Sequence, residues 1–368
     1  MPYKQDKKKV VCVHLLNDYS GSPLILSMVI KGLVQSGHEV ELITSRGKEG
    51  FLSNLPVTYR YFEYSFHPNK WIRLLRFFKS QVSVFRMIMD YRKENIQLYI
   101  NTLLPFGAAL AGKLTGKKIN YHLHESYIQP RLLKHILKQV ASHCADSAIY
   151  VSNYLLEAEH LKGVKNTVIY NVLPDEFTER AGHHYIFQQK NNFIVLMISS
   201  MKRYKGINEY VTLAAKMAEL NFELVLNASQ VEINEYFSNI SLPANLQIYP
   251  VQKDVHPFYQ RASLVVNLSN PVQCIETFGM TLLEGMCYGL PVIGPPVGGP
   301  TEVIAEGING YSIDSRNVEQ LAATIRSISC NSYLQLQLSK GAKKTASHFS
   351  EHQLHQRVEK IVSNYFFF

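Results

Sequence analysis

The sequence contains no uninterrupted apolar run of the roughly 18 to 20 residues that a membrane-spanning helix needs. Asp-x-Asp does not occur in it either. Without such a carboxylate pair to hold a divalent ion, we expect no catalytic metal, and we expect no cofactor. Cysteine is scarce and scattered, with no CxxC pair, which is typical of a reducing compartment. The five cysteines are Cys12, Cys144, Cys274, Cys287 and Cys330.

Charged residues make up only 18% of the 368 residues, and hydrophobic residues make up 46%. This composition excludes a disordered chain and indicates substantial buried cores. Lys and Arg outnumber Asp and Glu by 38 to 29, so the net charge is +9. The surplus favours anionic partners such as nucleotides or acidic lipid surfaces. The basic residues are spread out and form no recognised nucleic-acid-binding module, so we expect no nucleic acid as a partner.

The amino-terminal residues superficially resemble a secretory signal. Three lysines at 7–9 precede an apolar run over 10–16, but the run is short, contains His14 and leads into Asn17 and Asp18 with no small-residue cleavage site. We interpret this segment as a basic leader followed by the first strand. The expected location is therefore the cytoplasm.

Short apolar runs alternate with longer helical periods along the whole chain, a pattern that predicts parallel sheets covered by helices. A helix is expected from Pro23 to Gln35, closed by Gly37 as its C-cap. Strands are expected over 10–15, 40–44, 98–101, 119–122, 148–151, 193–198, 223–226, 246–249, 264–268, 291–294 and 310–313.

The alternation is interrupted between Asn171 and Asn192, where Pro174, Gly182 and a run of Gln, Lys and Asn indicate a linker. We therefore expect one Rossmann-like domain over 1–172, a linker over 173–192, a second Rossmann-like domain over 193–350 and a final helix within 351–368. Two doubly wound domains joined in this way enclose a cleft and bind ligands at the carboxyl ends of their strands.

The most informative segment runs from Glu276 to Glu284. We expect a loop carrying Glu276 to lead into a helix that begins near Phe278, with Glu284 about two turns inside. Eight residues at a rise of 1.5 Å separate the carboxylates by roughly 12 Å along the axis, which exceeds the about 5 to 9.5 Å of a glycosidase acid–base pair. The amides of residues 278–281 form a helix N-terminus that suits a phosphate. A sugar nucleotide fits this layout, with a sugar hydroxyl at Glu276, a diphosphate at the helix start and ribose hydroxyls at Glu284.

This segment resembles the motif E-x-F-G-x-x-x-x-E-A-x-x-x-G-x-P-V of the retaining GT-B glycosyltransferases, family 4 in particular. The sequence departs from it only at Gly285, where alanine is usual. The resemblance implies an α/β protein of the GT-B fold, with two doubly wound Rossmann-like domains facing a central cleft. The matching residues are Glu276, Phe278, Gly279, Glu284, Gly289, Pro291 and Val292.

Further positions resemble this family elsewhere in the chain. Lys205, which precedes a glycine, matches the family's Lys-Gly pair, whose lysine contacts the donor diphosphate. The arginine that the family often places five residues earlier is Ser200 here, and Val251 falls where the backbone brackets the nucleobase. Gly21 matches the second glycine of the loop near the donor phosphates. His124, at a strand end, matches the histidine that faces the donor sugar.

The resemblance therefore implies that His124, Glu276 and Lys205 are catalytic. It also implies that the first domain binds the acceptor and that the second binds the nucleotide sugar. The final helix is expected to pack back towards the first domain. No carboxylate is placed as a nucleophile, so we expect a front-face substitution in which the leaving phosphate helps to deprotonate the acceptor. The expected donor-binding residues are Gly21, Ser200, Lys205, Val251, Glu276, Phe278, Gly279, Met280, Thr281 and Glu284.

Two other functions fit parts of this pattern. One is a different GT-B enzyme, such as a sugar-nucleotide epimerase, which would need further acid–base residues and no acceptor. The other is a non-catalytic, membrane-associated GT-B module, which the departures at Ser200 and at Pro250, where the family usually has glycine, support. The intact Glu276, Glu284 and Lys205 favour a transferase over that module.

Residues 70–93 predict an amphipathic helix with a basic face. Its main apolar stripe is expected to face the core, while Phe77, Val84 and Ile88 lie among the basic residues. A basic face with apolar insertions is typical of a helix that contacts anionic lipid. Together with the family resemblance, it indicates a peripheral protein at the inner face of the cell membrane. The expected acceptor is a glycan or lipid-linked glycan in cell-surface polysaccharide synthesis. The stripe consists of Trp71, Leu74, Leu75, Phe78, Val82, Phe85 and Met89.

Overall fold

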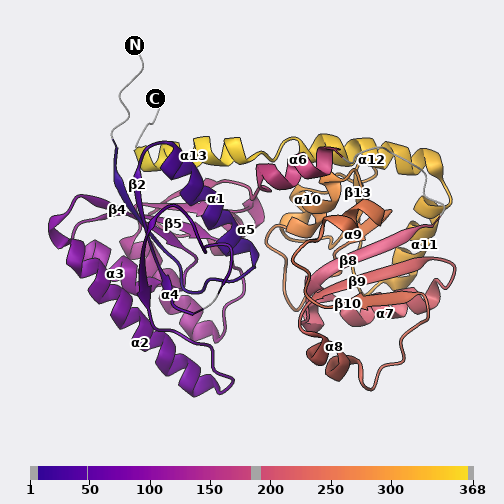
Figure 1. Cartoon of the computed structure of the whole chain (residues 1–368), viewed down its shortest axis with the longest axis horizontal. Coiled ribbons are helices and arrows are strands. Elements are labelled where there is room, and N and C mark those ends of the chain that lie inside the picture. The colour runs from indigo at the N-terminus through magenta and orange to yellow at the C-terminus, as the bar shows by residue number, and fades with distance from the viewer. Residues whose placement is uncertain (1–6, 48, 184–191, 364–368) are drawn as a thin grey trace, which may run out of the picture. The chain divides into compact units, whose positions relative to one another are not determined.

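The computed structural model describes residues 7–47, 49–183 and 192–363. The chain forms two compact units (Figure 1). Unit 1 comprises residues 1–172 and 351–368, and unit 2 comprises residues 173–350. The predicted linker contains a helix, α6 (Asp175–His183), which belongs to unit 2 and packs on its helix α10. Residues 184–191 of the predicted linker and the last five residues of the predicted final helix lie outside the described residues.

Unit 1 is built on a seven-stranded parallel sheet with the order β3-β2-β1-β4-β5-β6-β7. All five strands predicted for this part of the sequence are present, and the two that were not predicted, β3 and β7, form its edges. Edge strands bury fewer side chains, so their apolar signal is weak. The strands are β1 (Lys9–Val13), β2 (Glu39–Ser45), β3 (Thr58–Phe62), β4 (Ile96–Asn101), β5 (Lys118–Leu123), β6 (Ser147–Tyr150) and β7 (Lys165–Val168).

The helices of unit 1 pack on this sheet. The final helix of the chain also belongs to unit 1. Helix α13 (Glu351–Ser363) packs on α1 (Gly21–Gln35), which Gly37 ends in a left-handed conformation, as predicted. Helix α3 (Phe106–Leu114) packs against both α2 (Lys70–Met89) and α4 (Arg131–Cys144) (Figure 1). The short α5 (Asn153–Glu159) follows β6, and a 3₁₀ turn, η1 (Asp90–Lys93), follows α2.

Helix α2 turns the opposite face to the core from the one that the sequence predicts. Phe77, Val84 and Ile88 are buried, whereas Trp71 and Leu75 of the predicted core stripe are 66% and 71% exposed. The neighbouring helix selects this face. The backbone of α3 approaches α2 so closely at Gly107 that a Cβ atom there would lie 2.2 Å from the carbonyl oxygen of Gln81. The same glycine amide donates to the Gln81 side chain.

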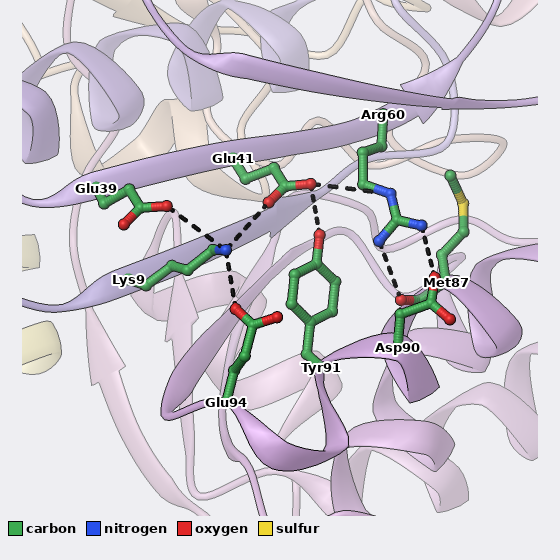
Figure 2. A network of polar contacts seen from close by, with 8 residues as sticks. All are labelled: Lys9, Glu39, Glu41, Arg60, Met87, Asp90, Tyr91 and Glu94. Carbon is green, nitrogen blue, oxygen red and sulfur yellow. Dashed lines mark hydrogen bonds and ion pairs between the residues drawn. The ribbon is translucent and has the colours of Figure 1, made fainter.

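A polar network lies at the amino-terminal end of the unit 1 sheet (Figure 2). Glu41 of β2 is buried and accepts a 2.5 Å hydrogen bond from the Tyr91 hydroxyl. The Lys9 ammonium lies 3.7 Å from the Glu41 carboxylate, and the Arg60 guanidinium 3.9 Å. Burial, together with the Glu41 carboxylate, raises the pKa of Tyr91 to about 12, so its hydroxyl stays a donor. Because these strands are parallel, the network is at the end of the sheet opposite to their carboxyl ends.

Unit 2 contains a six-stranded parallel sheet with the order β10-β9-β8-β11-β12-β13, and all six of its strands were predicted. Its core lies between this sheet and helices that include α7 and α11. The strands are β8 (Ile194–Ser200), β9 (Asn221–Asn227), β10 (Leu246–Tyr249), β11 (Leu264–Val266), β12 (Val292–Gly294) and β13 (Gly310–Ser312). The helices after α6 are α7 (Ile207–Lys216), α8 (Gln230–Phe237), α9 (His256–Arg261), α10 (Met280–Cys287), α11 (Val318–Ser329) and α12 (Ser332–Ala346).

Among the described residues, every helix is too short or too polar to cross a lipid bilayer.

Candidate functional site

In unit 2, the structure brings Lys205 and Glu276 into direct contact. The Lys205 ammonium donates to Oε2 of Glu276 at 2.6 Å and lies 3.4 Å from the Ser269 hydroxyl. Ser269 also donates to the same carboxylate oxygen at 3.3 Å. Lys205 ends the turn η2 (Arg203–Lys205) just after β8, and Ser269 follows β11. The three groups therefore meet at the carboxyl ends of two neighbouring strands, where doubly wound sheets bind ligands.

Both members of this pair are held in their charged forms. Burial alone would raise the pKa of Glu276, but the Lys205 ammonium and hydrogen bonds from Asn267 and Ser269 hold it below its usual value. Burial likewise opposes the charge on Lys205, and the Glu276 carboxylate more than compensates and raises the lysine pKa. The site thus presents a fixed carboxylate and a fixed ammonium side by side at neutral pH.

Glycines hold the loop that carries Glu276. The Gly299 amide donates to the Glu276 carbonyl at 3.0 Å. A Cβ atom on Gly298 would lie 2.3 Å from that same carbonyl oxygen, and one on Gly206, next to Lys205, would lie 2.1 Å from the Leu268 carbonyl. Gly206 and Gly298 also have positive φ angles of 78° and 84°. Only glycine combines this backbone conformation with so close an approach.

Helix α10 begins at Met280, two residues later than the sequence predicts. Gly279 has a φ of 101° and serves as the N-cap, which bends the chain out of the Glu276 loop. The Phe278 ring is buried, 1% exposed, and packs on Phe349, so the side chain is part of the core and the predicted donor contact concerns its backbone amide. The first-turn amides of the helix, those of Met280 and Thr281, lack acceptors within the helix and suit a phosphate group.

Glu284 lies in the middle of α10 and is half buried. The Tyr259 hydroxyl of α9 donates to its Oε2. Burial raises the pKa of Glu284, although this hydrogen bond opposes the shift. Tyr259 stacks on Tyr288 with ring centroids 5.6 Å apart, and Phe177 of α6 packs on both rings. The tyrosine pair thus fixes the orientation of the Glu284 carboxylate. This carboxylate can accept hydrogen bonds from the hydroxyl groups of a ribose.

The remaining predicted donor residues of unit 2 lie after strands of the same sheet. Ser200 is the last residue of β8, and its carbonyl accepts from the Lys202 amide. Val251 follows β10, its side chain is 54% exposed, and its amide donates to the Ala228 carbonyl at 2.9 Å. The Val251 amide is thus engaged within the fold, and its exposed side chain is what a flat base could contact.

In unit 1, His124 belongs to a buried polar cluster at the carboxyl ends of β4 and β5. Its Nε2 donates to Oδ1 of Asn101 at 2.9 Å. The Asn101 amide group donates to the Ser22 carbonyl at 3.1 Å and lies 3.1 Å from Nδ1 of His14. Because a carbonyl can only accept, Ser22 fixes the orientation of the amide, and Asn101 in turn requires a proton on Nε2 of His124.

The histidines of this cluster are neutral. Burial, reinforced by the neighbouring His122 and His14, holds the pKa of His124 well below its usual value. Burial lowers the pKa of His14 to about 4 and that of His122 to about 3. His122 is fully buried and hydrogen-bonds to the Tyr99 hydroxyl. His124 is itself only 9% exposed, so it acts as an oriented neutral hydrogen-bonding group.

Glu125 follows His124 and was not singled out by the sequence. Burial raises its pKa to about 7, although hydrogen bonds from the backbone and from Thr102 oppose the shift. Its Oε2 is buried without a hydrogen-bond partner. Burial thus favours the protonated form of this carboxyl group, which can donate a hydrogen bond to a hydroxyl group.

Gly21 is the first residue of α1, next to Ser22, whose carbonyl binds Asn101. It is exposed, and a Cβ atom placed on it would meet nothing within 4 Å. The fold of unit 1 does not require a glycine here. The open space in front of it leaves room for a ligand to approach the backbone.

Sequence reasoning missed Asn101, Ser269 and Tyr259, which contact predicted site residues, and His14, which contacts Asn101. Asn101, His14 and Ser269 come at or just after the carboxyl end of a strand, which is the signal that could have found them. Tyr259 lies inside a helix, and only its spatial partner distinguishes it. Among the described residues, no three His, Cys, Asp or Glu side chains are grouped so that they could hold a metal ion.

Comparison with known proteins places this geometry in a family. The model described as Glycosyltransferase Family 4 matches residues 21–177, and the one described as Glycosyl transferases group 1 matches residues 184–345. The chain belongs to glycosyltransferase family 4. It is thus a retaining transferase that uses nucleotide-sugar donors, and its two parallel sheets are the Rossmann-like sheets of the GT-B fold.

Among curated relatives, N-acetyl-α-D-glucosaminyl L-malate synthase of Bacillus anthracis is 25% identical over 94% of this chain and 92% of its own length. The sucrose synthase of Thermosynechococcus vestitus is 48% identical over 50 residues, which are 14% of this chain and only 6% of that enzyme.

Solved structures resemble the whole fold. Anabaena HepE in complex with UDP and glucose has a TM-score of 0.78 at 18% identity and covers 97% of this chain and 100% of its own. WaaG, a glycosyltransferase involved in lipopolysaccharide biosynthesis, has a TM-score of 0.71 at 13% identity, with 96% and 99% covered.

Proposed function

We propose that this glycosyltransferase moves a sugar from a uridine-diphosphate donor to a hydroxyl group of a glycan or lipid-linked glycan, as part of cell-surface polysaccharide synthesis at the cytoplasmic face of the membrane. The observation that supports the transfer best is the Lys205–Glu276 pair beside the first turn of α10, with Glu284 further along the same helix. The choice of UDP rests on the HepE complexes with UDP and with UDP-glucose.

In this proposal the donor lies along the Glu276–Glu284 segment. The diphosphate accepts from the amides of Met280 and Thr281 and from the Lys205 ammonium, which offsets the charge that develops on the leaving group. Glu276 accepts from a sugar hydroxyl, and Glu284 from the ribose hydroxyls. A bound diphosphate competes with Glu276 for Lys205, so donor binding loosens the 2.6 Å ion pair.

The proposed reaction is a front-face substitution. The bond between the anomeric carbon and the phosphate oxygen breaks while the acceptor oxygen approaches the same face, which preserves the anomeric configuration. The acceptor proton passes to the departing diphosphate, whose charge Lys205 and the helix amides stabilise. His124, neutral and with its proton fixed on Nε2, positions the transferred sugar through a hydrogen bond.

A second observation favours an acceptor at a membrane. Helices α2, α3 and α4 contain no acidic residue, and α2 alone carries Lys70, Arg73, Arg76, Lys79 and Arg86. These three helices pack side by side (Figure 1) and expose large apolar side chains between the basic ones. Such a surface attracts anionic lipid and inserts into its interface. The exposed apolar residues are Trp71, Ile72, Leu75, Phe78, Val82, Leu110, Leu114, Leu132 and Ile136.

Thermal stability measured with UDP-, GDP-, dTDP- and ADP-sugars tests the donor proposal. A ligand at a hundredfold excess over its Kd stabilises the native state by about 2.7 kcal/mol, or roughly 5 to 10 °C for a unit of this size. We expect UDP-sugars to give this shift and Glu284→Ala to lose most of it.

The matched control for this experiment is Glu235→Ala, which removes an exposed carboxylate from α8 of the same unit. It should leave the shift intact. A wild-type protein that none of the four nucleotide families stabilises, or a Glu284→Ala variant that responds like the wild type, contradicts the donor proposal.

Trp71 is the only tryptophan of the chain and is 66% exposed, so its fluorescence reports on the proposed membrane face. With vesicles of phosphatidylglycerol and phosphatidylethanolamine we expect a blue shift of its emission that about 0.5 M salt weakens, because screening shortens the reach of the basic side chains. Phosphatidylcholine vesicles should give little change.

Leu75→Glu should reduce binding to the anionic vesicles at least tenfold. Val231→Glu, which changes a side chain that is 75% exposed on α8 of unit 2, is the control and should bind as the wild type does. Equal emission in all vesicles, or equal loss in both variants, would exclude the face formed by α2, α3 and α4.

A further inference from the structure

Unit 2 contains an aromatic cluster that holds the tyrosine partner of Glu284. The stacked rings of Tyr259 and Tyr288 are inclined by only 13°. Phe177 packs edge-on against both, with its ring centroid 6.2 Å from that of Tyr259 and 6.1 Å from that of Tyr288. Helices α6 and α9 and the end of α10 therefore meet at Tyr259 and fix its ring. The cluster consists of Phe177, His256, Tyr259 and Tyr288.

The two hydroxyl groups of the stacked tyrosines have different partners. Nδ1 of His256 hydrogen-bonds to the Tyr288 hydroxyl, whereas the Tyr259 hydroxyl donates to Oε2 of Glu284. Tyr259 is fully buried. Burial, and after it the Glu284 carboxylate, raises the pKa of Tyr259 well above its usual value. The Tyr259 hydroxyl therefore keeps its proton, and its hydrogen bond to Glu284 keeps its direction.

Glu284 differs from Glu276 in the group that favours its charged form. Against burial, the Lys205 ammonium holds the pKa of Glu276 below its usual value. Burial raises the pKa of Glu284, and the Tyr259 hydroxyl opposes this shift, so a neutral donor takes the place of a cation. A hydroxyl has a single proton and occupies one acceptor position of the carboxylate. The other acceptor positions of Glu284 remain available to a ligand.

A carboxylate that is already oriented suits the vicinal hydroxyl groups of a ribose. A glutamate side chain that is free to rotate loses conformational entropy when it binds a ligand, whereas one fixed in advance loses little. The fixed hydrogen bond to Oε2 sets the plane of the Glu284 carboxylate before a ligand arrives. A site built to accept from hydroxyl groups discriminates against an analogue that lacks them, because the carboxylate is then left without a partner.

We propose that Tyr259 is a positioning residue for the donor, and that its hydroxyl orients Glu284 so that the site selects a nucleotide with a ribose over one with a deoxyribose. This inference rests on the proposed function and deepens it, because it assigns the selectivity of the proposed ribose contact to a residue outside the sequence motif. Because Tyr259 is fully buried, it acts through Glu284 and does not touch the donor.

Isothermal titration calorimetry on the full chain with UDP and with 2′,3′-dideoxy-UDP measures this selectivity. The two probes share the base and the diphosphate, so the ratio of their Kd values reports the ribose hydroxyl groups. We expect the wild type to bind UDP about tenfold or more tightly than the dideoxy analogue. Tyr259→Phe keeps the ring stack and removes the hydroxyl, and by weakening UDP binding it should reduce this ratio to about threefold or less.

Steady-state kinetics of Tyr259→Phe should show the same division. The donor KM should rise about five- to tenfold and kcat should change by less than about twofold, because Lys205 and Glu276 are untouched. In a Glu284→Ala background, Tyr259→Phe should not weaken UDP binding further, since the hydroxyl then has no carboxylate to orient.

Tyr210→Phe is the matched control. Tyr210 of α7 is also fully buried in unit 2, and its hydroxyl donates to the carbonyls of Val195 and Glu223 at 2.7 and 3.0 Å. Loss of either tyrosine hydroxyl lowers stability, which melting curves measure, but Tyr210→Phe should retain the wild-type ratio of Kd values. If both variants change the ratio equally, or if Tyr259→Phe retains it, Tyr259 has only a structural role and the inference is wrong.

Glu284→Ala separates this outcome from a failure of the proposed function. A wild type that does not bind UDP, or that binds both probes equally, contradicts the proposed donor contacts and overturns the inference with them. The same holds if Glu284→Ala retains the selectivity. Selectivity that Glu284→Ala loses and Tyr259→Phe retains leaves the proposed function in place and overturns this inference alone.

Discussion

At the scale of single residues, Asn101 holds the predicted catalytic histidine in one tautomer. Its amide joins the carboxyl ends of β4 and β5 to the first turn of α1 through His124 and Ser22. Gly21 precedes Ser22, so the histidine and the glycine predicted to contact the donor share one scaffold. This connection makes Asn101 a positioning residue for the transfer reaction.

Asn101→Ala should lower kcat about 10- to 100-fold, because His124 loses the acceptor that fixes its ring. The donor KM should change less than kcat, since the donor-binding residues of unit 2 are untouched. Asn101→Asp places a carboxylate beside His124 and raises its pKa, so the pH profile of kcat should shift. Steady-state kinetics of donor hydrolysis and of transfer measure both effects.

Asn120→Ala is the matched control. Asn120 is also a fully buried asparagine of the same sheet, but it accepts from the Ser147 hydroxyl and contacts no predicted site residue. If both variants lose stability and activity to the same degree, Asn101 has only a structural role.

Sequence reasoning predicted Glu276 and Glu284 because one local motif contains both, and it predicted Lys205 from a separate Lys-Gly pair that resembles the family's. It could not identify Asn101 or His14. Their contacts join strands that are distant in the chain, and an asparagine or a histidine at a strand end is common. The Phe278 ring lies in the core, so the donor contact predicted for this residue concerns only its backbone amide.

At the scale of elements, α2 shows what helical periodicity leaves undetermined. Apolar side chains occur on both of its faces, so the pattern predicts an amphipathic helix without selecting the buried side. The close approach of Gly107 on α3 selects it, and this contact is not visible in the sequence of α2. The strands β3 and β7 were missed for a different reason. They lie at the edges of the sheet, bury few side chains and are therefore only weakly apolar.

The network around Glu41 allows a prediction for the stability of unit 1, because it connects β2 to β1 and β3. Glu41→Gln should destabilise unit 1 by about 1 to 3 kcal/mol, because Lys9 and Arg60 then lose a partially buried counter-charge. Calorimetric unfolding measures this loss. Glu39→Gln removes another partner of Lys9 on the same strand, but its side chain is 71% exposed, and we expect less than about 0.5 kcal/mol. Equal effects of the two variants would contradict the importance of burial.

At the scale of the whole molecule, the buried neutral histidines make stability depend on pH. His14 has a pKa of about 4 in the folded state because of burial, against about 6.5 when unfolded. The contribution of neutral His14 to the free energy of unfolding is complete above about pH 6.5. It is lost as the pH falls towards 4, because His14 binds a proton more tightly in the unfolded state. This single group should cost on the order of 2 kcal/mol at pH 5.

His14, His122 and His124 all belong to unit 1, so acid should destabilise that unit first. Hydrogen exchange at pH 7.5 and pH 5 should show protection lost from β1, β4 and β5 before it is lost from β8 and β11. Uniform loss in both sheets, or a loss that begins in unit 2, would contradict this expectation.

The course of the last helix has a consequence for biosynthesis. Helix α13 belongs to unit 1, where the Val362 carbonyl accepts from Gln97 at the start of β4 and the Glu359 carboxylate binds His38 beside β2. A ribosome delivers the residues of unit 2 before it delivers α13, and domains fold as units while they emerge. The unit that is translated first is therefore the one completed last, and the surface of α1 that α13 covers stays exposed until unit 2 has been synthesised.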